Sequence, residues 1–135
     1  LDKDSTGLLL LTNDGDLANE IQRSRNNHEK EYHVRVNTDI TEDFIKKMSE
    51  GVEILDTVTK PCKVKKTGTR NFSIILTQGL NRQIRRMCDA LHVRVVHLKR
   101  VRIMNIRLGS LRPGEFRTLT REEEQELRRL VQKRS

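Results

Sequence analysis

The apolar residues of this chain come in short clusters bounded by turn-forming residues, and this spacing is the strongest constraint on its fold. Residues 8–11 are four leucines between Gly7 and a polar segment, and residues 32–36 and 72–77 are short stretches rich in β-branched and aromatic side chains. Helical patterns lie between them without the strict rhythm of a parallel βαβ sheet. We therefore expect an α+β fold, with a mixed, mainly antiparallel sheet flanked by helices.

Local signals place the individual elements. Thr41 is a helix N-cap with Gly51 as its stop, and Thr120 with Glu123 forms a capping box for the last helix. In chain order we expect a strand at 8–11 buried on both faces, a helix at 17–23, a strand at 32–36, a helix at 41–51, a hairpin of strands 58–64 and 72–77, a helix from 81 to about 91, a basic strand region at 93–108 with a bulge near 95–96, a turn at 113–114 and a helix ending near 133.

The length of 135 residues suits one domain, so we expect a single domain over residues 1–135. The chain opens at Leu1, without Met, immediately before a loop with candidate catalytic carboxylates. We therefore expect it to be a piece of a longer protein.

Charge favours a polyanionic partner. The chain has 27 Lys and Arg against 19 Asp and Glu, and each phosphate contacted by a cation releases condensed counterions. A solvated basic surface without a specific ligand is the alternative that charge alone leaves open. Two distant cysteines predict neither a disulfide nor a zinc site, which favours the reducing cytoplasm. No apolar run approaches the roughly 20 residues of a membrane-spanning helix.

The helix expected to start at an Asn81 cap has two distinct faces. Ile84 and Met87 fall on an apolar face with their neighbours at helical spacing, whereas Arg82, Arg85 and Arg86 gather on the opposite face. Arginines in a first turn oppose the helix dipole unless anions compensate them. Those anions come either from a polyanionic ligand or from acidic side chains of the protein itself.

The loop at residues 1–7 is the second candidate site, because it places carboxylates beside a turn that Gly7 allows. We interpret Asp4, Asp14 and Asp16 as helix caps or solvated loop residues. The same loop matches the D-x-D-x-T pattern of magnesium-dependent aspartate phosphotransferases through Asp2, Asp4 and Thr6. No strand precedes it in this chain and no later pair of acidic metal ligands is evident, so this remains a minor alternative.

Three segments together resemble a known family. Residues 1–15, 30–34 and 79–87 are similar, in this order, to the signature segments of RsuA-type RNA pseudouridine synthases, and the similarity continues at residues 100–103 and 113–115. Within that family, residues 28–32 and 57–60 look most like the synthase F type, which acts on the large ribosomal subunit. The resemblance implies the pseudouridine synthase catalytic fold and the isomerisation of a uridine in ribosomal RNA.

Residue roles follow from the matched positions. The resemblance implies Asp2 as the nucleophile, Tyr32 as a stacking residue and proton shuttle, Arg85 as the partner that holds Asp2 ionised, and Ile103 as an aliphatic wall of the uracil pocket. A uridine must be swung out of folded RNA before it can react, so phosphate contacts are also expected. Our candidates for these contacts are Lys30, Arg82, Arg86, Arg100 and Arg102.

The implied reaction is redox-neutral, so we expect no cofactor and no metal. The expected partner is ribosomal RNA, with tRNA left open, for a monomer in the cytoplasm without membrane contact. Members of the family carry Gly-Arg before the Leu-Asp pair and usually a small S4-like RNA-binding domain upstream, which this chain lacks. A non-catalytic RNA-binding module is the rival from another class, and the presence of Asp2, Tyr32 and Arg85 argues against it.

Overall fold

The structure is a computed structural model that describes residues 4–23 and 28–134. Its main sheet has the strand order β1-β7-β2-β6-β5, with β8 paired to β7, and a separate hairpin pairs β3 with β4. The strands are β1 (Thr6–Gly7), β2 (Lys30–Val36), β3 (Glu53–Ile54), β4 (Thr57–Val58), β5 (Lys63–Gly68), β6 (Asn71–Leu76), β7 (Val95–Ile103) and β8 (Ile106–Arg107). The helices are α1 (Gly15–Arg23), α2 (Glu42–Glu50), α3 (Gln83–Ala90) and α4 (Arg121–Arg134).

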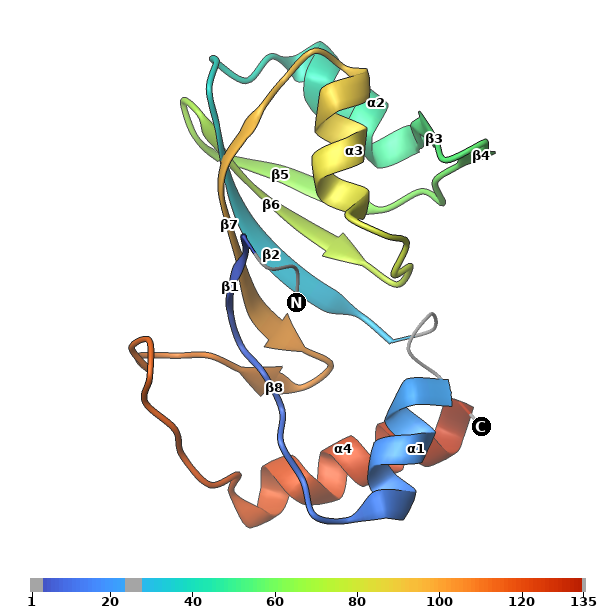
Figure 1. Ribbon diagram of the computed structural model, residues 1–135, viewed down its shortest axis with the longest axis vertical. Helices are drawn as coiled ribbons and strands as arrows, with labels where there is room; N and C mark the ends of the chain where they lie inside the picture. Colours follow the sequence, from blue (N-terminus) through green and yellow to red (C-terminus); the bar gives the residue numbers. More distant parts are fainter. Residues whose placement is uncertain (1–3, 24–27, 135) are drawn as a thin grey trace.

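Only the pairing of β1 with β7 is parallel among the described strands, and the other pairings are antiparallel. The expected α+β class with a mixed, mainly antiparallel sheet is therefore confirmed. Figure 1 shows α2 and α3 on one side of the sheet and the pair α1 and α4 below it. None of the described helices has the length and apolar character needed to cross a membrane.

Two apolar clusters hold these layers together. The larger one fills the space between the sheet and helices α2 and α3, where Met48, Phe72 and Met87 have no exposed surface. The smaller one joins α1 and α4 to the end of β7, around Ile106 and Val131. Burial of this apolar surface is the main stabilising term for both layers.

Helix boundaries follow the caps that local sequence predicted. The hydroxyl of Thr41 accepts from the Phe44 backbone N–H, and α2 ends at Gly51. The Thr120 hydroxyl accepts from the Glu123 N–H while the Glu123 carboxylate accepts from the Thr120 N–H, as a capping box requires. Asp14 also caps α1, because its carboxylate accepts from the Leu17 N–H.

The expected bulge in the basic strand is confirmed. Arg35 pairs with His97 but Val36 pairs with Val95, so Val96 is the extra residue on β7. A second register shift follows, since Glu31 pairs with Arg102 and Tyr32 with Arg100. The two shifts keep apolar side chains on one face of β7 although the sequence alternation slips.

The prediction of a buried strand at residues 8–11 is wrong. Strand pairing stops at Gly7, apart from the Leu8 N–H that donates to the Arg100 carbonyl, and the chain then leaves the sheet. Leu8 is buried and Leu10 packs on the smaller cluster, but Leu9 and Leu11 are 61% and 88% exposed. Four consecutive leucines are apolar at every position, so the pattern could not show whether this segment would pair with a neighbouring strand.

Two further boundaries differ from the predictions. The strand expected at 58–64 is interrupted, because residues 57–58 pair with β3 in a small hairpin and β5 begins only at Lys63, two residues after Pro61. The connection between the two strands of the hairpin is shorter than the predicted ranges 58–64 and 72–77 leave for it, since β5 continues to Gly68 and β6 begins at Asn71. Asn81 does not cap α3: the N-cap is Arg82, in a left-handed conformation with φ of 47°, and its side chain makes no cap hydrogen bond.

Candidate active site

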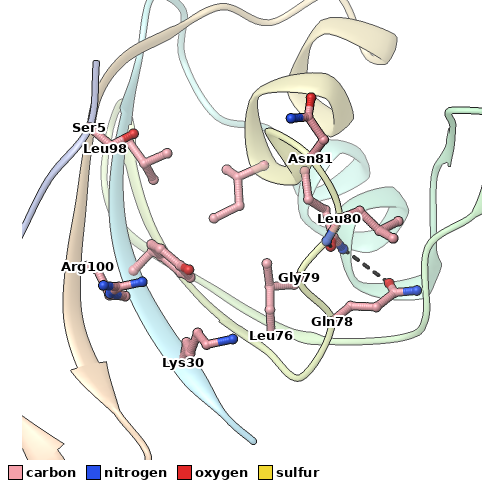
Figure 2. A pocket seen from close by; sticks show the side chains of 12 residues that line it. Ser5, Lys30, Leu76, Gln78, Gly79, Leu80, Asn81, Leu98 and Arg100 are labelled. Carbon is pink, nitrogen blue, oxygen red and sulfur yellow. Dashed lines mark hydrogen bonds between the residues drawn. The ribbon is translucent and has the colours of Figure 1, made fainter. Parts of the chain in front are cut away.

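A cavity of about 380 Å³ opens between the sheet and the N-terminal end of α3. Figure 2 shows Lys30, Leu98 and Arg100 on the strand side and the segment from Gln78 to Asn81 opposite them. The full lining consists of Ser5, Lys30, Tyr32, Leu76, Gln78, Gly79, Leu80, Asn81, Gln83, Ile84, Leu98 and Arg100. Seven polar or charged side chains and four aliphatic ones share this lining, a mixture that suits a flat ligand with polar edges, such as a nucleobase.

Strand alternation explains how Tyr32 reaches this cavity. On β2, Tyr32, Val34 and Val36 share the face that packs on the larger cluster, as the sequence pattern predicted. Val34 and Val36 are buried, whereas Tyr32 lies where the helix layer leaves a gap and is half-buried. The position of Tyr32 at the edge of the core therefore makes its ring part of the cavity wall.

An arginine pair of α3 clamps the loop that precedes β1. Arg82 donates two hydrogen bonds to the Asp4 carboxylate, at 2.9 and 3.1 Å. Arg85 donates to the Asp4 carbonyl at 2.9 Å and to the Ser5 hydroxyl at 3.3 Å. The hydrogen bond from Arg82 is the largest influence that holds the pKa of Asp4 below its usual range. Asp4 is therefore an ionised clamp residue: it lies in a loop with its side chain 50% exposed, as interpreted from the sequence, but it is also paired with Arg82.

The side chain of Arg85 is mostly covered, with 13% of its surface exposed. Its Nε atom is buried and makes no hydrogen bond to a described residue, although Asp4 Oδ1 lies 3.4 Å away. Asp2, the expected nucleophile and partner of Arg85, lies outside the described residues. The clamp nevertheless fixes Asp4 and Ser5, which directly follow that segment of the chain.

A pair of glutamines shapes the other wall. Gln83 is buried, and its amide accepts from the Leu80 N–H and donates to the Gln78 side chain at 3.2 Å (Figure 2). Gln78 in turn accepts from the Lys60 N–H. These bonds link the two ends of the segment from residue 78 to residue 83, and within it Arg82 adopts the left-handed conformation from which its guanidinium reaches Asp4.

Gly7 makes the close approach of the loop to β7 possible. Its φ is 117°, and a Cβ atom there would lie 2.3 Å from the Arg100 carbonyl oxygen. Arg100 completes the contact, because its guanidinium donates to the Leu8 carbonyl at 2.7 and 2.9 Å. The loop is thus tied to β7 on one side and to α3 on the other.

The remaining candidate residues, Arg86, Arg102 and Ile103, lie in three different surroundings. Arg86 bonds to the Asn81 carbonyl and side chain and is not among the described residues that line the cavity. Arg102 is 12% exposed and lies on the other face of the sheet, where it bonds to Glu29 and Glu31. Ile103 packs in the smaller apolar cluster, and the described residues that line the cavity include its register partner Lys30 but not Ile103.

Sequence reasoning missed four polar contributors to the site: Asp4, Ser5, Gln78 and Gln83. The need for an acidic group near the first-turn arginines was read from α3 itself, but nothing in the sequence selected Asp4 to supply it. The glutamines carried no such signal, because an amide in a loop shows no preference for a particular partner. Among the described residues, no group of three or more His, Cys, Asp or Glu side chains is arranged to hold a metal.

Comparison with solved structures places this fold. A solved structure titled crystal structure of pseudouridylate synthase superposes with a TM-score of 0.87 and 35% identity, over 94% of this chain and 56% of that one. The sheet, the flanking helices and the cavity between them therefore define a pseudouridylate synthase fold.

Sequence comparison gives the family. Residues 1–90 match the model of the RNA pseudouridylate synthase family, and the chain belongs to this family. It is 56% identical over its full length to the dual-specificity RNA pseudouridine synthase RluF of Escherichia coli, and 35% identical over 97% of its length to the ribosomal large subunit pseudouridine synthase B of Bacillus subtilis. The predicted resemblance to RsuA-type synthases, and to the F type among them, is confirmed.

The chain spans about half the length of these relatives, 47% of the first and 56% of the second. The other half of each relative has no counterpart in this chain, so the activity of the whole protein is proposed below.

Proposed function

We propose that the protein is an RNA pseudouridine synthase that isomerises a specific uridine of ribosomal RNA, of the large subunit in particular. The observation that carries this proposal is the clamp of Arg82 and Arg85 on Asp4 and Ser5, beside a cavity of nucleobase size in a chain of this family. Asp2 precedes this clamped segment by two residues in the sequence, and Ser5 of the same segment lines the cavity.

Asp2 is the proposed nucleophile. Its carboxylate attacks C1′ of the ribose, the bond from C1′ to N1 of uracil breaks, and the electron pair of that bond stays on N1. The detached base turns so that C5 forms the new bond to C1′ and displaces the carboxylate. The C5 proton then leaves and N1 takes up a proton, so the product is an isomer of the substrate and no other reactant is consumed.

Tyr32 and Arg85 are assigned supporting roles. Tyr32 forms part of the cavity wall, where its ring can stack on the detached uracil and its hydroxyl can carry the C5 proton. Arg85 has a buried Nε and is held in place by Asp4 and Ser5. We propose that the Arg85 guanidinium pairs with the Asp2 carboxylate and keeps that carboxylate ionised.

RNA contacts are proposed at Lys30, Arg82, Arg86, Arg100 and Arg102. Lys30 and Arg100 line the cavity and so support contacts with the flipped nucleotide. Arg82 and Arg102 already bind carboxylates of the chain, and each would have to exchange or share that partner to contact phosphate. For Ile103 the proposed contact with uracil has less support, because its side chain packs in the smaller cluster.

The test is tritium release from RNA labelled at C5 of uridine, with EDTA present. The full-length protein should release tritium, and the Asp2→Asn variant should release none. Asp16→Asn is the matched control, because Asp16 is an exposed carboxylate of α1 outside the site. Ribosomal RNA and tRNA should both be assayed, since the name of the Escherichia coli relative includes dual specificity.

Two other outcomes would identify the alternatives. RNA binding without release by the parent protein would indicate a non-catalytic RNA-binding module. Activity that needs magnesium and transfers phosphate would indicate the aspartate phosphotransferase. We further propose that the protein acts as a monomer in the cytoplasm without a cofactor, and that the chain is one catalytic domain preceded in its protein by an S4-like RNA-binding domain.

A further inference from the structure

The sheet has a second face, opposite the cavity, that no described helix covers in its upper part (Figure 1). The pairing of residues on neighbouring strands shows which side chains lie on this second face. His33 pairs with Ser73 on β6 and with Lys99 on β7, and Ser73 pairs with Lys65 on β5. Because opposite residues of paired strands point to the same side, one row crosses four strands. We call this surface the open face: His33, Arg35, Lys63, Lys65, His97 and Lys99.

The open face is cationic. Arg35 pairs with His97 and stands diagonal to Lys99, and Lys63 and Lys65 lie two residues apart on the same side of β5. All of its six residues are exposed except Lys99, which is half-buried. Glu31, two residues from His33 on the same side of β2, is already bound by Arg102 at 3.0 Å, and so is Glu29 at 3.3 Å.

The cations of this face are not compensated within the described part of the chain. No salt bridge from Arg35, Lys63, Lys65 or Lys99 reaches a carboxylate of residues 4–19 or 28–131. Like charges on facing strands destabilise a sheet. Lysines on an edge strand such as β5 also discourage strand addition, but that role does not require the cations of the inner strands β2 and β7.

The composition of the open face selects the type of ligand. Its pairs combine Lys, Arg and His with Ser73 and Asn71, and the apolar Ile75 is half-buried. A dry protein interface needs an apolar centre, which this surface lacks. A row of cations over four strands spans roughly 14 Å at about 4.8 Å per strand, a length that suits a polyphosphate backbone rather than a single small anion.

We propose that the open face is a second RNA-binding surface, which holds the phosphate backbone of the substrate outside the nucleotide in the cavity. The inference rests on the proposed function for the identity of its ligand. RNA that leaves the cavity and passes around the edge strand β5 meets Lys63 and Lys65 first, and then Arg35 and Lys99. Contacts of this kind add affinity without reading sequence.

The test compares two triple variants of the full-length protein, each with three positive charges removed. The first carries Arg35→Gln, Lys65→Gln and Lys99→Gln. The second, a matched control, carries Lys46→Gln, Lys47→Gln and Arg121→Gln, whose side chains are exposed on α2 and α4. Affinity for a long ribosomal RNA fragment is measured by fluorescence anisotropy between 50 and 200 mM salt, with folding checked by circular dichroism.

The open-face variant should bind about 100-fold more weakly at 0.1 M salt, and its slope of log affinity against log salt should be smaller by about 2 to 3, since each lost phosphate contact removes about 0.7–0.9. The control should keep the parent slope. Each single open-face variant should lower the slope by less than one unit, which keeps the test decisive if the triple variant does not fold.

An unchanged slope in the open-face variant, or an equal loss in the control, would overturn the proposal. Tritium release from a short RNA at saturating concentration separates this result from the proposed function. The open-face variant should release tritium at the parent rate, because none of its substitutions touches the cavity. A parent protein that binds RNA without release would refute the proposed function and leave the binding comparison intact.

Discussion

The arginines on the cavity side and the cations of the open face have the same charge but opposite surroundings. Arg82 and Arg85 bind the Asp4 segment, Arg86 binds Asn81, and Arg100 binds the Leu8 carbonyl. On the other side of the sheet, the cations of the open face have no carboxylate partner among the described residues. These cavity-side arginines therefore hold the protein's own loops in place, whereas the cations of the open face remain available to a ligand.

Arg102 shows that the distinction depends on partners and not on the side of the sheet. It projects on the same side as the open face, yet it is 12% exposed because Glu29 and Glu31 surround it. A count of basic residues could not separate Arg102 from Lys99, although they are three residues apart in one strand.

The first prediction concerns the cavity side. Arg85→Gln should lower the rate of tritium release on the order of 10²- to 10³-fold, because it removes a preorganised charge beside the proposed nucleophile. RNA affinity and its salt slope should change little, since Arg85 is 13% exposed. Single-turnover assays at saturating enzyme separate the two quantities. A normal rate would show that Arg85 only supports the loop.

The second prediction concerns the covered cation beside the open face. Arg102→Met should lower the free energy of unfolding by about 2–3 kcal/mol, because Glu31 loses its partner in a mostly covered position. Urea unfolding measures this loss, and the double variant with Glu31→Gln should recover part of it. A stable Arg102→Met protein with a smaller salt slope would instead assign Arg102 to RNA, as the sequence suggested.

The third prediction concerns the clamp. Asp4→Asn should lower the rate about tenfold, equivalent to roughly 1.4 kcal/mol, with little change in KM, because it loosens the loop without touching substrate. Since Arg82 lowers the pKa of Asp4, the pair stays ionised throughout the usual assay range. The effect should therefore be the same at pH 5 and pH 8. A pH-dependent defect would mean that Asp4 itself takes part in proton transfer.

The fourth prediction gives a reference for a compensated cation at the surface. Arg117 donates two hydrogen bonds to Glu123 and, with the Thr120 N–H, lowers the pKa of Glu123 to about 2. Because the folded-state pKa is depressed, this stabilisation is present above about pH 4.5 and lost as the pH falls towards 2.

Glu123→Gln should therefore lower the free energy of unfolding at pH 7 by less than about 1 kcal/mol, and so lower the melting temperature slightly. This difference from the parent should shrink towards pH 2. Thermal melting of both proteins across that range measures it. A difference that does not change with pH would show that the charge contributes nothing and that only the shape of the cap matters.

The smallest effect is expected on the open face itself. Arg35→Thr should leave the free energy of unfolding within about 0.5 kcal/mol of the parent, or raise it, because the substitution relieves like charge and introduces a residue that favours strands. Urea unfolding at low salt is the sensitive measurement. A clear loss of stability would show that Arg35 has a structural partner and would weaken the contrast with Arg102.

Local chemistry explains which elements could be predicted. Features that depend on residues close together in the chain could be read from the sequence. These are the caps of α2 and α4, the apolar face of α3 and the bulge at Val96. Family resemblance was legible for the same reason, since each of its segments is short and continuous.

Long-range geometry decided the rest. Residues 8–11 failed as a strand because β7 pairs only as far as Gly7, and Asn81 failed as a cap because Gln78 and Gln83 fold its loop. The partner of Arg82 is 78 residues away in the chain, so no local pattern could distinguish Asp4 from the other loop carboxylates.

The order of residues was enough to predict the class of fold, the family, the residues that alternate on each strand and the excess of positive charge. Which of those charges meet a carboxylate depends on how strands and helices distant in the chain come together, so it is visible only in the folded arrangement. Alternation placed His33 and Arg35 on one face of β2, but the position of α2 and α3 on the opposite face is what leaves them exposed.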